Sequence, residues 1–343
     1  MKKILVTGGA GYIGSHTLLE LSEDTSFGLI SIDNYSNSHP ESYTLLEELA
    51  GMKIGHTDID LCDAAATEAF FDKHRPDGII HFAAFKAVGE SVENPLKYYH
   101  NNLNALQNIL KNAERVKSKA LIFSSSCSVY GNITTLPVDE NTPLPKAESP
   151  YAYSKQIGEQ MISDFIRNCD FLKAISLRYF NPVGAHHSGK IGEWSLQKPN
   201  NLVPLITGTA IGKYPSLTVY GSDYTTRDGT CVRDYVHVSD IARAHILALK
   251  RILQNKTESK HEIFNLGTGM GVSVLEAIAA FEKVSGVRLN YTLGQRRSGD
   301  VEAVFSDSSL ALRQLGWECR ENLESMMESA WKWELFRKAN NML

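Results

Sequence analysis

The sequence predicts an α/β protein in which a doubly wound parallel sheet is followed by a smaller C-terminal α/β lobe. Three observations lead to this fold class. Short apolar, β-branched runs alternate with longer amphipathic segments, a glycine-rich turn follows the first run, and the alternation weakens past the middle of the chain. At 343 residues the chain has room for about two domains, each with its own core.

Apolar runs in the first half of the chain are expected to be strands. They cover residues 3–7, 29–32, 78–82 and 120–124, and the helical patterns between them cover 12–21, 64–73 and 95–117. A helix over 151–165 and a strand over 173–178 extend the series. Because strands that alternate with helices are joined by right-handed crossovers, the sheet should be parallel and covered on both faces.

The regular alternation ends after residue 182. Residues 184–234 are rich in Gly, Pro, Asn, Ser and Thr, which is typical of a loop-rich lobe. Helical patterns return at 238–254, 273–285 and near 323–338, with a short strand at 262–265. We therefore expect a first domain over 1–180, joined by segments near 236–266, and a second lobe over 181–343.

Composition and charge exclude several classes of protein. The chain carries 35 basic and 39 acidic residues, a net charge of −4, so it has no strong field to hold nucleic acid. The longest uncharged stretch, 120–138, is too polar for a bilayer core, and no apolar signal segment follows the first residues. The five cysteines lack C-x-x-C spacing and no histidines have H-x-x-x-H spacing, so we expect reduced thiols, no metal site and a cytoplasmic location.

The turn after the first strand has the pattern of a dinucleotide-binding site. It reads Thr-Gly-Gly-Ala-Gly-Tyr-Ile-Gly over residues 7–14 and opens a helix, which predicts a Rossmann-type sheet. Glycines there let the backbone approach a pyrophosphate that lies on the helix N-terminus. Asp33, nineteen residues past Gly14, can accept hydrogen bonds from a ribose 2′-hydroxyl and would repel a 2′-phosphate, which favours NAD over NADP.

A tyrosine and a lysine are expected on one face of the helix that starts near Pro150. Tyr151 and Lys155 are four residues apart, whereas Tyr153 is only two residues from Lys155 and would face away. A phenol has a pKa near 10, and a neighbouring ammonium group should bring it towards neutral pH, so Tyr151 is a candidate base. Ser126, in the serine-rich end of the strand at 120–124, is a candidate proton relay.

Together these residues resemble the extended short-chain dehydrogenase/reductase family. The strings at 81–91, 178–186, 199–202 and 228–235 are similar to its UDP-hexose 4-epimerases, and the resemblance covers nearly the whole chain. The resemblance implies that the NAD contacts are Gly8, Gly11, Tyr12, Ile13, Gly14, Asp33, Asn34, Asp60, Leu61, Phe82, Ala83, Lys86, Asn101, Tyr151, Lys155 and Tyr179. It also implies that the nucleotide sugar is contacted by Lys86, Ser126, Tyr151, Asn181, Asn201, Leu202, Tyr220, Arg233, Arg297 and Asp300.

The activity implied by the resemblance is reversible 4-epimerisation of UDP-glucose and UDP-galactose. Tyr151, with Ser126 as relay and Lys155 as charge partner, would take the proton of the sugar 4-hydroxyl while C4 loses a hydride to NAD. The hydride would return to the other face of the sugar, so NAD has to stay bound. The resemblance further implies a homodimer joined by helices around 95–117 and 154–167.

The chain departs in two places from the patterns of related enzymes. Related dehydratases have an acidic residue just after the serines, where this chain has Cys127 and Ser128, so a dehydratase is disfavoured. Val304 stands where many relatives have a bulky Tyr beside the sugar, which suggests room for the N-acetyl group of UDP-GlcNAc or UDP-GalNAc. The alternatives are another NAD-dependent nucleotide-sugar epimerase or reductase of the family, or a non-catalytic NAD-binding regulator.

Overall fold

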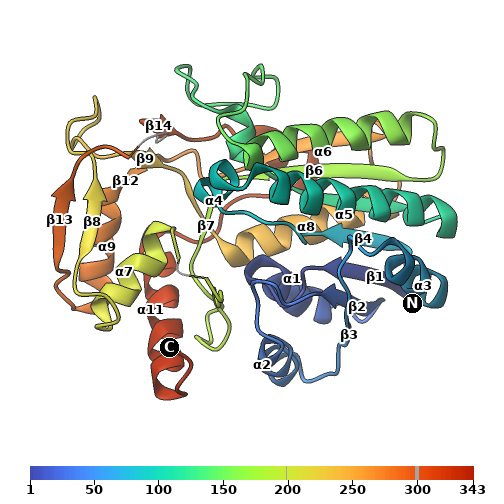
Figure 1. Cartoon of the computed structure of the whole chain (residues 1–343), viewed down its shortest axis with the longest axis horizontal. Helices are drawn as coiled ribbons and strands as arrows, with labels where there is room; N and C mark the ends of the chain where they lie inside the picture. Colours follow the sequence, from blue (N-terminus) through green and yellow to red (C-terminus); the bar gives the residue numbers. More distant parts are fainter. Residues whose placement is uncertain (198, 298–300) are drawn as a thin grey trace.

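The computed structural model describes residues 1–197, 199–297 and 301–343, and its main feature is a seven-stranded parallel sheet (Figure 1). The strand order is β11-β6-β5-β4-β1-β2-β3, so the sheet grows outward in both directions from β1 and confirms the doubly wound fold. The strands are β1 (Lys2–Thr7), β2 (Phe27–Asp33), β3 (Gly55–Asp58), β4 (Gly78–His81), β5 (Ala120–Ser126), β6 (Lys173–Tyr179) and β11 (His261–Leu266).

Helices cover both faces of this sheet, as the sequence predicts. Alternate residues of β1 point to opposite faces: Val6 packs in one apolar cluster with Leu18 and Leu249, whereas Leu5 packs in another with Leu106. The first cluster is covered by α1 (Tyr12–Ser22), α2 (Glu41–Ala50), α8 (Val238–Leu253) and α10 (Ser309–Leu315). The second is covered by α3 (Ala64–His74), α5 (Pro95–Val116) and α6 (Pro150–Arg167), and short helices α4 (Val88–Glu93) and η1 (Cys127–Tyr130) follow β4 and β5.

The rest of the chain forms a second region with its own apolar core, on the left of Figure 1. Ile206, Phe281 and Met327 meet there, from helices α7 (Leu202–Ala210), α9 (Val274–Ser285) and α11 (Leu323–Ala339). Short strands complete it: β7 (Asn181–Val183) pairs with β10 (Tyr235–His237), β8 (Leu217–Tyr220) with β13 (Tyr291–Gly294), and β9 (Val232–Arg233) with β12 (Val272–Ser273) and β14 (Ala303–Val304).

The predicted elements are present, and the structure adds some that the sequence pattern does not indicate. Strand β3 lies at the edge of the sheet with all four of its residues exposed, so it lacks an apolar alternation. Helix α7 falls inside the stretch expected to be mainly loop, and Pro204 and Gly208 obscure its pattern. Among the residues that the structure describes, no helix is long and apolar enough to cross a membrane.

Candidate active site

A cavity of about 340 Å³ opens at the carboxyl ends of the central strands. This is the position where doubly wound sheets bind their ligands. Every residue expected to contact NAD lines this cavity, from the glycine turn after β1 to Tyr179 at the end of β6. The structure therefore brings that whole set together in one place.

The glycine turn has the shape that a pyrophosphate requires. Gly8 has a φ of +71°, and a Cβ there would lie 3.0 Å from the Ala83 nitrogen. A Cβ on Gly14 would lie 2.1 Å from the Gly8 carbonyl oxygen, so α1 can approach the turn this closely only without a side chain. Gly11 caps α1 without a side-chain hydrogen bond, which leaves the first N–H groups of the helix available to an anion. These residues fit a dinucleotide.

Asp33 is held at the end of β2 with its carboxylate turned towards the glycine turn. Its Oδ2 accepts from the Ala10 N–H at 2.9 Å, and its Oδ1 accepts from the Tyr35 N–H at 2.9 Å and the Ser38 hydroxyl at 2.8 Å. The side chain is buried but lines the cavity. Oδ1 already accepts two hydrogen bonds, whereas Oδ2 accepts one and has further acceptor capacity, so the group can also accept from a ribose hydroxyl.

Tyr151 and Lys155 lie on the same side of α6 and both face the cavity. Helix α6 begins at Pro150, and the Ser149 hydroxyl caps it by accepting from the Ala152 N–H. The Lys155 Nζ lies 5.8 Å from the centre of the Tyr151 ring and donates to the Ser124 carbonyl at 2.7 Å. Tyr153 points elsewhere, with 49% of its surface exposed, so it is unsuited to the same role.

Burial dominates the electrostatics of this pair. It lowers the pKa of Lys155 to about 8 and raises the pKa of Tyr151 to about 12, although a hydrogen bond with Ser126 acts in the opposite direction on the tyrosine. The expected lowering of the Tyr151 pKa is therefore wrong for the chain by itself. The cost of burying a phenolate decides the direction of this shift.

The three serines at the end of β5 divide between the two sides of the sheet. Ser124 and Ser126 line the cavity, and the Ser124 hydroxyl forms a hydrogen bond with the Tyr179 hydroxyl. Ser125 points the other way and donates to Glu159 at 2.5 Å. Alternation along the strand puts Ser124 and Ser126 on the cavity side. Of these two, Ser126 forms a hydrogen bond with Tyr151.

The residues expected to contact the nucleotide sugar fall into two groups. Lys86, Ser126, Tyr151, Asn181 and Asn201 line the cavity already described. The second group extends beyond it: Leu202 begins α7, Tyr220 ends β8, Arg233 ends β9 and Val304 ends β14. Asp300 lies outside the described residues.

Contacts within the second group show how its members meet. The Arg297 guanidinium lies 5.8 Å from the centre of the Tyr220 ring. Val304 is the register partner of Arg233 between β14 and β9. The charge of Arg233 also acts on the Cys127 thiol, so this arginine is close to the end of β5. The guanidinium groups are suited to binding a diphosphate.

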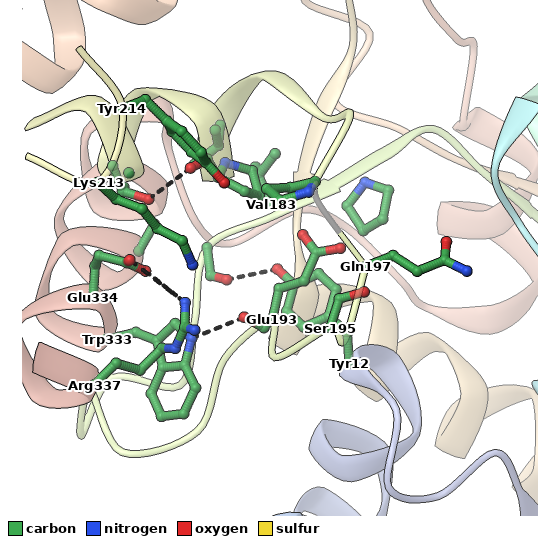
Figure 2. Close-up of a pocket in the computed structure, with 18 of the residues that line it drawn as sticks. Tyr12, Val183, Glu193, Ser195, Gln197, Lys213, Tyr214, Trp333, Glu334 and Arg337 are labelled. Carbon is green, nitrogen blue, oxygen red and sulfur yellow. Dashed lines mark hydrogen bonds and ion pairs between the residues drawn. The ribbon is translucent and has the colours of Figure 1, made fainter. Parts of the chain in front are cut away.

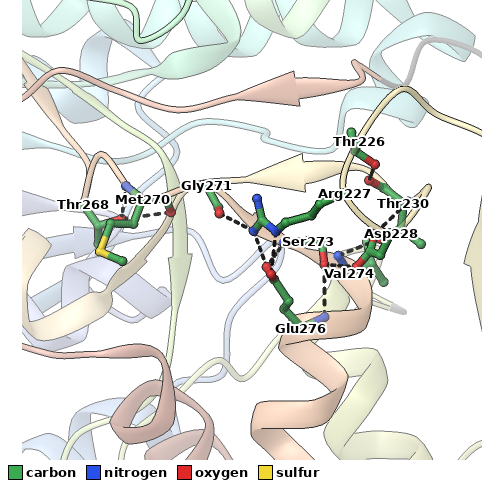
Figure 3. Close-up of polar contacts among 10 residues, drawn as sticks. All are labelled: Thr226, Arg227, Asp228, Thr230, Thr268, Met270, Gly271, Ser273, Val274 and Glu276. Carbon is green, nitrogen blue, oxygen red and sulfur yellow. Dashed lines mark hydrogen bonds and ion pairs between the residues drawn. The ribbon is translucent and has the colours of Figure 1, made fainter.

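A network of polar side chains ties the loop before β9 to the start of α9 (Figure 3). Asp228 accepts from the Thr230 N–H at 2.9 Å and from the Ser273 hydroxyl at the start of α9. Arg227 is paired with Glu276 and donates to the Gly271 carbonyl at 2.6 Å. The loop before β9 is thus tied to α9, which holds Arg233 in place.

Several cavity residues were not predicted from the sequence. Asn37 follows β2, and Glu193, Trp194 and Ser195 come from the loop before α7. No local motif marks these positions, because they reach the cavity only through the folding of distant segments.

Comparison with known proteins agrees with this geometry. A sequence profile described as the NAD dependent epimerase/dehydratase family matches residues 4–267. The chain belongs to this family. The resemblance found in the sequence is confirmed by a mouse protein, UDP-glucose 4-epimerase, which is 46% identical over 340 residues, 97% of each chain.

Solved structures of family members superimpose over nearly the whole molecule. The UDP-glucose 4-epimerase of Bifidobacterium longum, in complex with NAD+ and UDP, has a TM-score of 0.93 and 41% identity and covers 100% of both chains. The enzyme of Stenotrophomonas maltophila, with bound NAD and formylated UDP-arabinopyranose, has a TM-score of 0.94 and 40% identity over 99% of this chain and 100% of that one. In the part of the present chain that the structure describes, no group of His, Cys, Asp and Glu side chains is arranged to hold a metal ion.

Proposed function

We propose that this chain is a UDP-glucose 4-epimerase that interconverts UDP-glucose and UDP-galactose and uses NAD. One observation carries the proposal: Tyr151, Lys155 and Ser126 line the same cavity as the glycine turn and Asp33. A proton-transferring group and a dinucleotide site thus share one cavity, as C4 oxidation requires. The relatives named above have the same activity in their names.

NAD, when bound, supplies the acceptor for the C4 hydride, its later donor, and a positive charge beside the phenol. Tyr151 as phenolate takes the proton of the sugar 4-hydroxyl, directly or through the Ser126 hydroxyl. Lys155 holds its ammonium group beside the phenol and is itself oriented by the Ser124 carbonyl. After the 4-keto sugar has rotated to present its other face, Tyr151 returns the proton to the sugar O4. The reaction therefore leaves no net proton or redox change.

The two regions of the chain divide the work of binding. Residues 1–180, with α8 and β11 from the segment 236–266, would hold NAD, and the rest of 181–343 would hold the UDP-sugar. The contacts of Arg297 with Tyr220 and of Arg233 with Val304 support a site for uridine diphosphate there. A firm hold on UDP leaves the hexose free to turn between its two orientations, because the binding energy comes from the part that does not react.

The fold also supports assembly through α5 and α6 into a homodimer. Leu96 on α5 is 79% exposed, and Val92 on α4 and Tyr153 on α6 are 60% and 49% exposed. These apolar side chains lie on helices in contact with one another, and a second copy would cover them. Light scattering of the purified protein tests this, and a monomer would contradict it.

The free cysteines of the described chain support the cytoplasm as its location, because proteins of that compartment keep their thiols reduced.

The small side chain of Val304 supports acceptance of N-acetylated sugars. Val304 lies on β14 beside Arg233, and it is smaller than the Tyr expected there in many relatives. We expect turnover of UDP-GalNAc by the unaltered protein. Val304→Tyr should abolish it while UDP-galactose turnover persists, and Val304→Ala should retain both activities. No turnover of UDP-GalNAc by the unaltered protein, beside rapid turnover of UDP-galactose, would exclude this extension of the substrate range.

The activity itself is tested by incubating the purified protein with UDP-galactose without added cofactor. We expect UDP-glucose to form, and NAD to be released when the protein is denatured. A net change in NADH absorbance during turnover would instead indicate a reductase. Bound NAD without any sugar conversion would favour a non-catalytic regulator.

A further inference from the structure

Residues 193–197 separate two cavities, and we name this segment the strap. One of the cavities is the candidate active site, which Glu193, Trp194 and Ser195 line. The other, of about 370 Å³, lies between α7, α11 and the loop that carries the strap, and Glu193 and Ser195 line it as well (Figure 2). The strap therefore has open space on both sides.

Hydrogen bonds and an ion pair connect the strap to three separate parts of the chain. The Glu193 carboxylate pairs with the Lys86 Nζ at 2.9 Å, and the Glu193 carbonyl accepts from the Trp333 indole N–H on α11 at 3.1 Å. The Ser195 hydroxyl donates to the Asn37 side-chain oxygen at 2.7 Å, which also accepts from the Gln197 N–H at 3.2 Å.

A ring contact adds to these bonds. Trp194 stacks on His39, with ring centres 4.1 Å apart and planes 15° apart. His39 and Asn37 belong to the loop that follows Asp33, and Lys86 follows β4. The strap thus reaches from the second region to both loops that flank the dinucleotide part of the cavity.

Close packing does not fix the strap in this position. A segment in a protein core is held by neighbours on all sides, whereas cavities border the strap on two sides. Among the described residues, its position depends on a few hydrogen bonds, the ion pair of Glu193 with Lys86 and two ring contacts of Trp194, the stack on His39 and an edge-on contact with Trp333 at 6.4 Å. Breaking a few of these contacts should let it move away from the cavity.

We propose that the strap retains the dinucleotide: it closes the cavity over the bound cofactor, and cofactor leaves only when the strap opens. The inference rests on the proposed function, because an epimerase that regenerates its cofactor in every cycle has no need to exchange it. Trp333 and Ser195 are then positioning residues, which act on the cofactor through the strap.

The test compares NAD release from the protein with its cofactor bound, using an enzyme that consumes free NAD as a trap. Trp333→Phe removes the N–H that holds Glu193 and keeps an aromatic ring; Trp333 does not line the active-site cavity. Its matched control is Trp331→Phe on the same helix, where the indole packs edge-on against Phe281 in the core of the second region. We expect about fivefold faster release from Trp333→Phe, the effect of one neutral hydrogen bond, and unchanged release from Trp331→Phe.

Ser195→Ala, which removes the bond to Asn37, gives a second and independent measurement. It should also speed release about fivefold, and the double variant with Trp333→Phe should exceed either single one. Unchanged release in both variants, or equal acceleration in Trp331→Phe, would overturn the strap while leaving the proposed function intact. If the unaltered protein released no NAD on denaturation, the proposed function and the strap would both fall.

Discussion

At the scale of single residues, the chemistry depends on one phenol in a setting that favours its neutral form. Burial raises the pKa of Tyr151 to about 12, so the chain by itself does not make this side chain a base at neutral pH. The positive charges that favour a phenolate are those of Lys155 and of the bound oxidised cofactor. The reactive state thus requires the loaded site, which is consistent with an enzyme that keeps NAD.

Tyr151→Phe tests this assignment, because it removes the hydroxyl and keeps the ring. We expect the variant to retain NAD and to lose activity by at least about 100-fold, the usual contribution of a positioned acid or base. The measurement is the conversion rate of UDP-galactose together with the NAD content of the denatured protein. Tyr153→Phe, two residues along the helix and half-exposed, serves as the control and should keep full activity. Full activity in Tyr151→Phe would mean that another group is the base.

The sequence predicted site residues where local order defines them and missed those that depend on distant contacts. The glycine turn and the pair on α6 each form a local pattern with a strand or helix beside it. Glu193 and Trp194 reach the cavity because their loop contacts the segment after β2, about 155 residues earlier in the chain. The pKa of Tyr151 was also beyond prediction, because it depends on how completely the folded chain excludes water from the ring.

At the scale of elements, the same reasoning explains which helices and strands were found. Helix α5 has a strongly one-sided apolar pattern, and the central strands are continuous apolar runs, so both were predicted. Strand β3 is exposed along its length and forms through its backbone pairing with β2. The short strands β9, β12 and β14 have two residues each, too few to show a period.

A buried ion pair joins α6 to β6 beneath the candidate active site. Arg178 donates to Glu159 through Nε at 2.9 Å and through Nη2 at 2.6 Å, and both side chains are buried. Arg178→Met leaves a carboxylate buried without its partner, so we expect it to lower the free energy of unfolding by about 3 kcal/mol or more. Adding Glu159→Gln should restore part of the loss. Urea unfolding measures both effects.

The control for this pair is an exposed one on the same helix. Arg167 and Asp164 are 3.1 Å apart with more than half of each side chain exposed, so Arg167→Met should change stability by less than about 1 kcal/mol. If Arg178→Met were as mild as Arg167→Met, the buried pair would not be needed to hold α6 on the sheet.

At the scale of the whole molecule, buried histidines make stability depend on pH. Burial lowers the pKa of His16 and His81 to about 3 and that of His245 and His261 to about 4. The unfolded chain therefore binds protons below about pH 6.5 that the folded chain refuses, and stability falls as pH falls from about 6.5 towards 4. Each histidine contributes up to about 1.4 kcal/mol per pH unit in that window.

Urea unfolding at several pH values between 7 and 4 measures this slope. His245→Phe should reduce the proton uptake on unfolding by about one, because His245 is neutral when buried: its Nδ1–H donates to the Ile241 carbonyl, and its Nε2 has no partner in the described structure. Equal slopes in the unaltered protein and His245→Phe would show that this residue is already charged or accessible when folded.

The path of the chain predicts that the two regions unfold together. The chain leaves the sheet after β6, returns through α8 and β11, and leaves again before β12, and β11 pairs with β6 along six residues. Neither region has its elements in one continuous segment, so calorimetry should show one transition for the whole chain. Removing NAD should lower the midpoint temperature of that single transition.

At about 100 times its dissociation constant, NAD should add about 2.7 kcal/mol to stability. NADP at the same concentration should add much less, because Asp33 repels a 2′-phosphate. A second calorimetric transition whose temperature does not change with NAD would show that the second region folds independently.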